Sequence, residues 1–97
     1  MNVVVSNAAK IAVTGLPDED RRRVHAWFDR LKNWPTDQAV RKNSTRLLPE
    51  EEPSVYVLRS TSDVRIFFTV DGDEITVVDV ARKDSLKTVK AGDHRRE

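Results

Sequence analysis

Two arginines near the ends of one stretch are the first candidates for chemistry. In VRIFFTVDGDEITVVDVAR, residues 64–82, Arg65 and Arg82 flank two apolar runs joined by an Asp-Gly pair. A guanidinium keeps its charge at any working pH and donates two parallel hydrogen bonds, which suits the oxygens of a phosphate. The two residues predict an anion site, provided that the fold brings them to one face.

The length of the turn decides whether the two arginines share a face. Residues paired across an antiparallel hairpin lie on the same face, and the faces alternate along each strand. A loop of three residues would put Arg82 on the core face, where a charge needs a partner. A loop of two or four residues puts Arg65 and Arg82 together on the non-core face. We favour this even loop because Asp79, which it places in the core, can reach a donor near the strand end. The core face would then hold Val64, Ile66, Phe68, Val70, Ile75, Val77, Asp79 and Ala81.

The other reactive side chains give no recognisable site. His25 and His94 lie far apart in the sequence, and the chain has no cysteine. This is not the ligand spacing of a zinc site, and we assign no metal and no cofactor. No serine has a histidine within plausible reach, so a hydrolase triad is not indicated.

The elements that position the arginines follow from periodicity. The β-branched run at residues 3–6 predicts a strand. A helix is expected from Asn7 to about Val13, and a second one from Pro17 to about Asn33. The second helix has one apolar stripe with the spacing of a buried face. The stripe is Val24, Trp27, Phe28, Leu31 and Trp34.

The second half of the chain predicts a loop and three antiparallel strands. Residues 36–54 hold mixed polar residues and two prolines, so we expect a loop with one helical turn at about residues 37–42. Strands are expected at residues 55–59, 64–70 and 74–81. The order β-α-α-β-β-β predicts an α+β fold in which two N-terminal helices cover one face of an antiparallel sheet. The first strand should lie at an edge or beside the last strand.

Length and composition bound the protein's class. A chain of 97 residues makes one domain, which we place at residues 1–90, with a disordered polar tail at 91–97. Seventeen basic and sixteen acidic residues give a net charge of +1, so any anion-binding surface must come from local clustering. The N-terminus lacks a secretory signal or a membrane span, and the lack of cysteine suits the cytoplasm.

The order and pattern of these segments resemble the RelE/ParE family of toxins from bacterial type II toxin-antitoxin systems. The resemblance covers nearly the whole chain and rests on the opening strand, the helices ending in RLKNWP, the strand VYVLR, and DVRIFFTVDGDEITVVDVARKD. It implies a small cytoplasmic toxin that is neutralised by a cognate antitoxin. RelE-like members act at the ribosome as metal-independent mRNA endoribonucleases, whereas ParE-like members inhibit DNA gyrase.

The resemblance also implies roles for individual residues. Arg65 matches the strand arginine that acts on the scissile phosphate, and Arg82 matches the closing basic residue, a phosphate contact or acid. Arg59 matches a basic position of the preceding strand. Further candidates for contacts with the substrate phosphates are Lys83, Lys42, Arg46 and Tyr56.

The chain departs from the RelE-like nucleases at their other catalytic positions. Val55 and Val57 stand at or near the positions where those enzymes carry lysines, and Leu86 stands where they often carry a tyrosine. Three functions therefore remain open: an mRNA endoribonuclease that inhibits translation, a gyrase inhibitor, and an inactive member that only binds an antitoxin. In each case we expect a partner to cover exposed apolar residues such as Phe67, Val78 and Val80.

Overall fold

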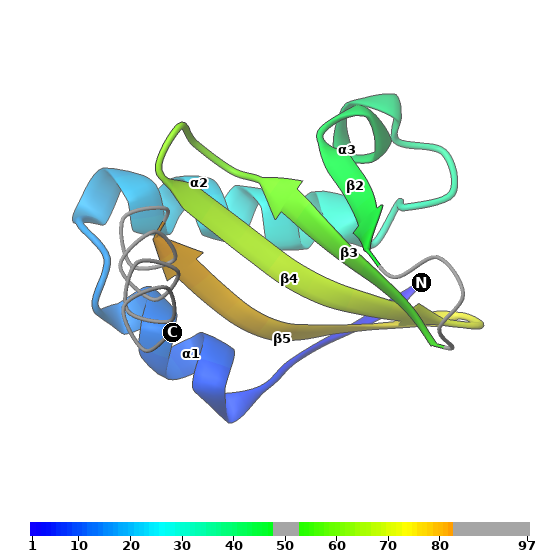
Figure 1. Ribbon diagram of the computed structural model, residues 1–97, viewed down its shortest axis with the longest axis horizontal. Coiled ribbons are helices and arrows are strands. Elements are labelled where there is room, and N and C mark those ends of the chain that lie inside the picture. The colour runs from blue at the N-terminus through cyan, green and yellow to red at the C-terminus, as the bar shows by residue number, and fades with distance from the viewer. Residues whose placement is uncertain (48–52, 83–97) are drawn as a thin grey trace, which may run out of the picture.

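A five-stranded sheet with helices against one face forms the protein (Figure 1). The structure is a computed structural model, and it describes residues 1–47 and 53–82. The strand order is β1-β5-β4-β3-β2. The α+β class is as predicted. The predicted boundary at residue 90 and the predicted tail at 91–97 lie outside the described residues.

The N-terminal part supplies one edge strand and two helices. β1 (Asn2–Val5) pairs in parallel with β5 (Glu74–Arg82), so the first strand is both at an edge and beside the last one. α1 (Asn7–Thr14) begins after Ser6, whose Oγ accepts a hydrogen bond from the Ala9 N–H at 3.1 Å. The cap is thus Ser6, and the helix begins at Asn7 as predicted.

The second helix, α2 (Asp18–Leu31), lies behind the sheet in Figure 1. It follows Pro17, and its first turn carries three acids that favour the positive end of the helix dipole. The predicted stripe is confirmed: Val24, Phe28 and Leu31 are buried, and Trp34 is buried just beyond the helix.

The segment expected to be a loop contains a short helix and a strand. α3 (Gln38–Lys42) confirms the predicted helical turn, whereas the edge strand β2 (Ser44–Leu47) was not predicted. β2 has only four residues, three of them polar, so it is too short for a clear alternation. β3 (Ser54–Arg59) and β4 (Val64–Asp71) confirm the next two predicted strands, and β3 pairs antiparallel with both β2 and β4.

The hairpin of β4 and β5 contains a bulge that the sequence analysis did not foresee. Asp71 pairs with Glu74 across a two-residue loop, in which Gly72 has a φ of 59°. Such a left-handed conformation suits glycine, and the even loop is as predicted. However, Phe68 pairs with Val77 and Phe67 pairs with Asp79, so that Val78 is an extra residue in β5.

The bulge reverses the faces predicted for the end of β5. Beyond it, Val80 lies opposite Ile66 and is buried, whereas Asp79 is exposed. Arg82 lies opposite Val64, on the helix-covered side of the sheet, and is exposed at the strand end. The prediction that Arg65 and Arg82 share the non-core face is therefore wrong. The expectation that Val80 is exposed for a partner is wrong for the same reason.

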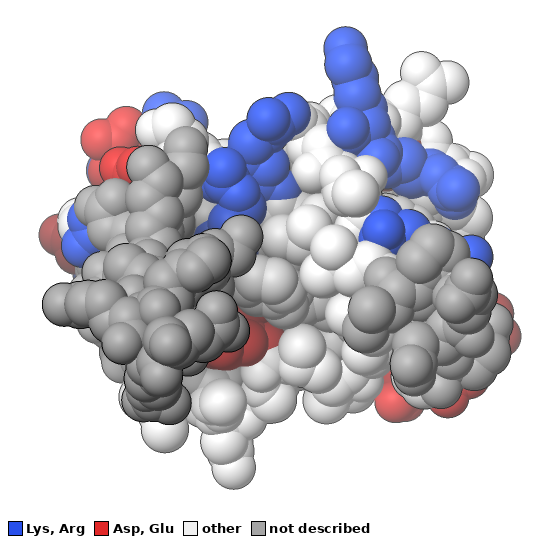
Figure 2. Space-filling model, in the orientation of Figure 1, with Lys and Arg blue, Asp and Glu red and all other residues white. Residues whose placement is uncertain are grey.

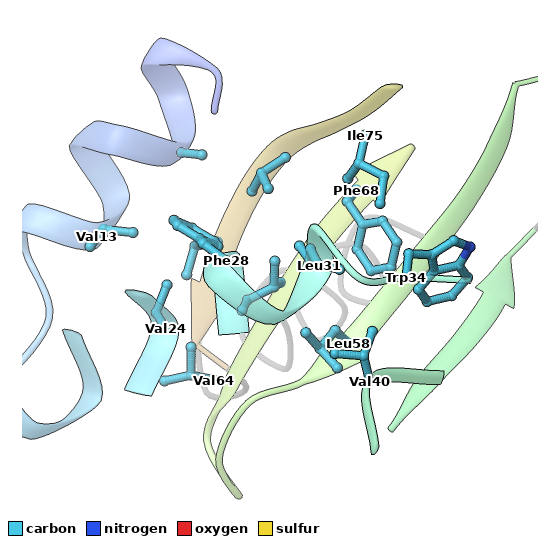
Figure 3. Close-up of a cluster of buried hydrophobic side chains, with 14 of the residues drawn as sticks. Val13, Val24, Phe28, Leu31, Trp34, Val40, Leu58, Val64, Phe68 and Ile75 are labelled. Atoms are coloured by element: carbon cyan, nitrogen blue, oxygen red, sulfur yellow. The ribbon is translucent and has the colours of Figure 1, made fainter. Parts of the chain in front are cut away.

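The core lies between the helices and the sheet (Figure 3). Phe68 and Leu58 from the sheet and Leu31 from α2 are fully buried there. The ring of Tyr56 stacks on Phe68 at 5.4 Å, and Trp34 meets both rings edge-on. The opposite face of the sheet has no helix over it within the described residues, and we call it the open face. None of the described helices is long and apolar enough to cross a membrane.

A basic pocket on the open face

A shallow pocket of about 160 Å³ lies on the open face where α3, β2, β3 and β4 come together. Figure 2 shows Lys and Arg side chains gathered over this upper part of the face, while the visible Asp and Glu atoms lie toward the sides and the lower part. We call this hollow the basic pocket. Its lining residues are Lys42, Asn43, Thr45, Val57, Arg59 and Arg65.

Two arginines stand directly opposite one another in the wall of the basic pocket. Arg59 of β3 and Arg65 of β4 are cross-strand partners. Neither forms an ion pair with a carboxylate among residues 1–47 and 53–82. Like charges in directly opposite positions destabilise a sheet. The pair therefore costs stability in the absence of an anion, and an anion placed between the two guanidinium groups would offset that cost.

Arg65 is held by the loop that precedes its strand. Its Nη1 donates hydrogen bonds to the carbonyl oxygens of Thr61, Ser62 and Val64, at 2.9, 3.3 and 3.3 Å. In the described chain, Nε and Nη2 have no hydrogen-bond partner. One side of the guanidinium is thus fixed to the protein, and the remaining donors are available to a ligand. This arrangement reduces the entropy lost on binding.

The loop is itself attached on both sides. The hydroxyl oxygen of Thr61 accepts hydrogen bonds from the backbone N–H groups of Asp63, at 3.1 Å, and Val64, at 3.0 Å. From α2, the indole Nε1 of Trp27 donates to the Ser60 carbonyl at 3.4 Å. Arg65 therefore receives its position from a loop that is tied to the helical layer.

The other wall of the basic pocket is the C-terminal end of α3. The carboxylate of Asp37 caps this helix by accepting from the N–H groups of Ala39 and Val40, at 3.0 and 3.2 Å. It also accepts two hydrogen bonds from Arg30 of α2, at 2.9 and 3.1 Å. The Arg30 guanidinium, followed by the Val40 N–H, holds the pKa of Asp37 below its ordinary value.

Helix α3 is joined directly to the strand that carries Arg59. The backbone N–H of Arg59 donates to the carbonyl of Asn43 at 3.0 Å. The side-chain amide of Asn43 donates back to Ala39 at 2.8 Å, which closes the helix end. Lys42 is exposed at this end, where a cation is favoured by the helix dipole. These bonds bring Lys42 to the rim of the basic pocket beside Arg59.

The structure brings three of the candidate residues together and separates the others. Arg65, Arg59 and Lys42 line the basic pocket. Arg82 is not among its lining residues, because the bulge puts it on the other face of β5. Lys83 lies outside the described residues.

Tyr56 and Arg46 occupy the helix-covered side of the sheet. Tyr56 lies opposite Phe68 in the register of β3 and β4, and its ring packs on the core. Arg46 is the cross-strand partner of Tyr56 and shares that side. Neither prediction of a contact in the same site as Arg65 therefore agrees with the structure.

Asn43 and Thr45 also line the basic pocket beside Lys42, and neither was a candidate from the sequence. Their position depends on β2, the strand that was not predicted. Thr45 is a β-branched residue in the short run STRL, and this weak signal was the sequence evidence for that strand.

The side chains that line the basic pocket have the chemistry to bind an oxyanion. Two guanidinium groups, an ammonium group, a side-chain amide and a hydroxyl converge on it. Its lining residues include no histidine, carboxylate or tyrosine, so this part of the described chain supplies charge stabilisation rather than an evident general base.

Solved RelE structures have the same fold as this chain. RelE in the archaeal RelE–RelB complex from Pyrococcus horikoshii OT3 aligns with a TM-score of 0.70 and 19% identity, over 84% of this chain and 93% of that chain. A chain of the RelB–RelE antitoxin–toxin complex from Methanococcus jannaschii aligns with a TM-score of 0.71 and 15% identity, over 89% of this chain and 96% of that chain. A chain of the toxin–antitoxin complex RelBE2 from Mycobacterium tuberculosis aligns with a TM-score of 0.64 and 15% identity, over 84% of this chain and 95% of that chain.

No protein-family model matches the chain, and no curated protein matches it. The structural likeness over most of both chains nevertheless confirms the predicted architecture: this chain has the RelE/ParE-like toxin fold.

Proposed function

We propose that the protein is the toxin of a type II toxin-antitoxin system and acts, as RelE-like toxins do, by cleaving messenger RNA at the ribosome. The observation that carries this proposal is the cross-strand pair Arg59 and Arg65 in the basic pocket, with Lys42 at its rim. The likeness to RelE chains solved in complex with RelB supports a cognate antitoxin as the partner.

The chemistry that the pocket supports is stabilisation of charge on a phosphate. When a 2′-hydroxyl attacks the neighbouring phosphorus, negative charge develops on the phosphate oxygens, and the oxygen that leaves must gain a proton. The donors of Arg65 that are not held by the loop would bind those oxygens, and Arg59 would bind from the neighbouring strand. A site of this kind can work without a metal.

Primer extension on messenger RNA in a translating extract tests the proposal. The wild-type protein should produce new ends on ribosome-bound RNA, and Arg65→Ala should reduce their yield by at least tenfold. Arg22→Ala, which removes an exposed arginine from α2, is the matched control and should cleave like the wild type. If the wild type produces no new ends, nuclease activity on translated RNA is disproved.

A second candidate function, gyrase inhibition, is favoured by two valines of β3, one of which lines the basic pocket. Val55 and Val57 lie on the open face opposite Thr69 and Phe67, at or near the positions where the RelE-like nucleases carry lysines. A valine cannot accept a proton. A general base is needed only for cleavage of RNA. A toxin that binds its target without cleaving RNA, as ParE-like toxins do, would not need one. A supercoiling assay with saturating protein separates the two, since a gyrase inhibitor must stop supercoiling while leaving messenger RNA intact.

A further inference from the structure

A second hollow lies on the opposite side of the sheet, between α1, α2 and β1. Its volume is about 350 Å³, larger than the 160 Å³ of the basic pocket. Its walls are mainly apolar and come from Val5 of β1, Val13 of α1 and Phe28 of α2. Figure 3 shows Val13 pointing from α1 toward the Phe28 ring. The proposed function makes no use of this space, which we call the helix-side pocket.

Positive and hydrogen-bonding groups surround the helix-side pocket. Lys10 of α1 and Arg21 and His25 of α2 are among its lining residues. Arg21 is paired with the exposed carboxylate of Asp18. Lys10 has no ion pair within the described chain, and α1 contains no acidic residue that could supply one. The apolar hollow thus has an unbalanced positive charge on its α1 side.

This combination defines the chemistry of an occupant. Small-molecule sites typically occupy 300–1,000 Å³ and combine apolar walls with a few convergent polar groups. A volume of 350 Å³ has room for roughly ten heavy atoms at about 30 Å³ for each. An apolar group would fill the space between Val13 and Phe28, and an anionic head would meet Lys10, with the ring nitrogens of His25 as further partners.

We propose that the helix-side pocket binds a small anionic amphiphile, a chain of about eight carbons that ends in one carboxylate or similar charge. The pocket is separated from the basic pocket by the sheet itself. The proposal therefore does not depend on the proposed toxin function, and each can fail without the other.

The test is a titration of the isotopically labelled full chain with octanoate, followed by amide chemical shifts. Octanoate should shift the amides of Val13, His25 and Phe28 in a saturable way. Hexanoate should bind roughly tenfold more weakly because it buries two fewer methylene groups. The matched neutral probe, 1-octanol, should bind more weakly than octanoate because it lacks the charge that Lys10 attracts.

Two variants locate the ligand. Lys10→Gln should lower the affinity for octanoate about threefold and leave the affinity for 1-octanol unchanged, since it removes an exposed charge and no apolar wall. Lys42→Gln removes a like charge at the basic pocket and should leave the affinity for both probes unchanged. Thr14→Trp, at an exposed position of the rim, should block both probes. A well-dispersed amide spectrum establishes that each variant is folded.

Several outcomes would overturn the proposal. The proposal fails if octanoate at millimolar concentration leaves the amides of Val13 and Phe28 unshifted, or shifts those of Arg59 and Arg65 instead. Equal affinity for octanoate and 1-octanol would remove the role of charge. If Thr14→Trp changes the sedimentation coefficient of the ligand-free chain, the pocket is a contact between two copies rather than a ligand site.

Discussion

Arg59 and Arg65 place two positive charges side by side on neighbouring strands. The two side chains differ in how firmly the protein holds them. Arg65 donates to the carbonyl oxygens of Thr61 and Ser62 in the preceding loop and of Val64, whereas Arg59 is exposed and without an ion pair in the described chain. The pair repels itself when the basic pocket is empty. Binding and stability should therefore respond in opposite directions when one charge is removed.

Replacing Arg59 by leucine should stabilise the ligand-free protein and weaken its anion site. Loss of the repulsion should raise the free energy of unfolding by about 0.5 kcal/mol. Urea denaturation with and without 50 mM phosphate measures both effects. The increase in stability on adding phosphate should be smaller in Arg59→Leu than in the wild type.

Arg22→Leu is the control, since Arg22 is exposed on α2 and far from the sheet pairing. It should leave the phosphate-dependent increase as it is in the wild type. An Arg59→Leu variant with lower stability in water and an unchanged response to phosphate would contradict this account of the pair.

The sequence identified the basic side chains of the pocket better than their geometry. Arg65 was a candidate from its place in the hairpin, whereas Arg59 and Lys42 became candidates through the resemblance to the RelE/ParE toxins. Arg82 was assigned to the wrong face because alternation predicts faces only along an unbroken ladder of strand pairing. One extra residue in β5 reverses the faces beyond it. The burial of Tyr56 depends on the register of β3 and β4, which the loop between them does not reveal.

At the scale of elements, one carboxylate joins helix α3 to the helical layer. Asp37 caps α3 and binds Arg30 of α2 through two hydrogen bonds, so it joins the helix that carries Lys42 to the helical layer. Its pKa is lowered from an ordinary value of 3.8, first by Arg30 and then by the Val40 N–H.

This ion pair makes a pH-dependent contribution to stability. Because the folded-state pKa of Asp37 is lowered, the unfolded chain binds more protons between the two pKa values, and stability rises with pH there. The contribution is complete above the ordinary value near 3.8 and is lost as the pH falls through the folded value. Asp37→Asn keeps a capping side chain but loses the charge. Urea denaturation at several pH values should show the wild type more stable than Asp37→Asn at pH 7 and the difference shrinking below pH 4.

Asp29→Asn is the matched control for that experiment. Asp29 is exposed and forms a surface ion pair with Lys32 at 3.7 Å, so its loss should matter little at any pH. A difference between wild type and Asp37→Asn that stays constant from pH 7 to pH 2 would show that the charge of Asp37 contributes nothing.

The loop before β4 depends on the indole of Trp27. Its hydrogen bond to the Ser60 carbonyl links α2 to the loop that holds Arg65. Trp27→Phe should lower the free energy of unfolding by about 1 kcal/mol and speed amide exchange at residues 61–64. Hydrogen exchange followed by NMR measures this directly. Unchanged exchange in that loop would mean that the indole bond does not order it.

The order of elements could be predicted because each long element has its own periodicity. The stripe on α2 and the alternation of β4 gave their buried faces, as the burial of Phe28 and Phe68 shows. β2 and the bulge at Val78 could not be predicted in the same way. Both depend on pairing between strands, and a single strand of four residues or a single extra residue leaves little periodic signal.

At the scale of the whole molecule, charge is concentrated rather than abundant. The net charge is only +1, yet three cations line one pocket on the open face. Binding of single-stranded RNA should therefore be salt-dependent to a limited degree. With three phosphates contacted, the plot of log Kobs against log salt should have a slope of about −2.

Fluorescence anisotropy with a short labelled RNA measures that slope. Arg65→Ala should reduce its magnitude by about 0.7, and Arg22→Ala should leave it unchanged. A slope near zero for the wild type, or an equal loss for both variants, would argue against phosphate binding at the basic pocket.

The bulge at Val78 gives β5 one residue more than its pairing requires. If Val78 were deleted, Asp79 would still lie opposite Phe67, Val80 opposite Ile66 and Arg82 opposite Val64, now in an unbroken ladder. The strand is therefore one residue longer than its pairing needs. Loss of a residue at this point would leave every inward-facing side chain of β5 opposite the same partner on β4.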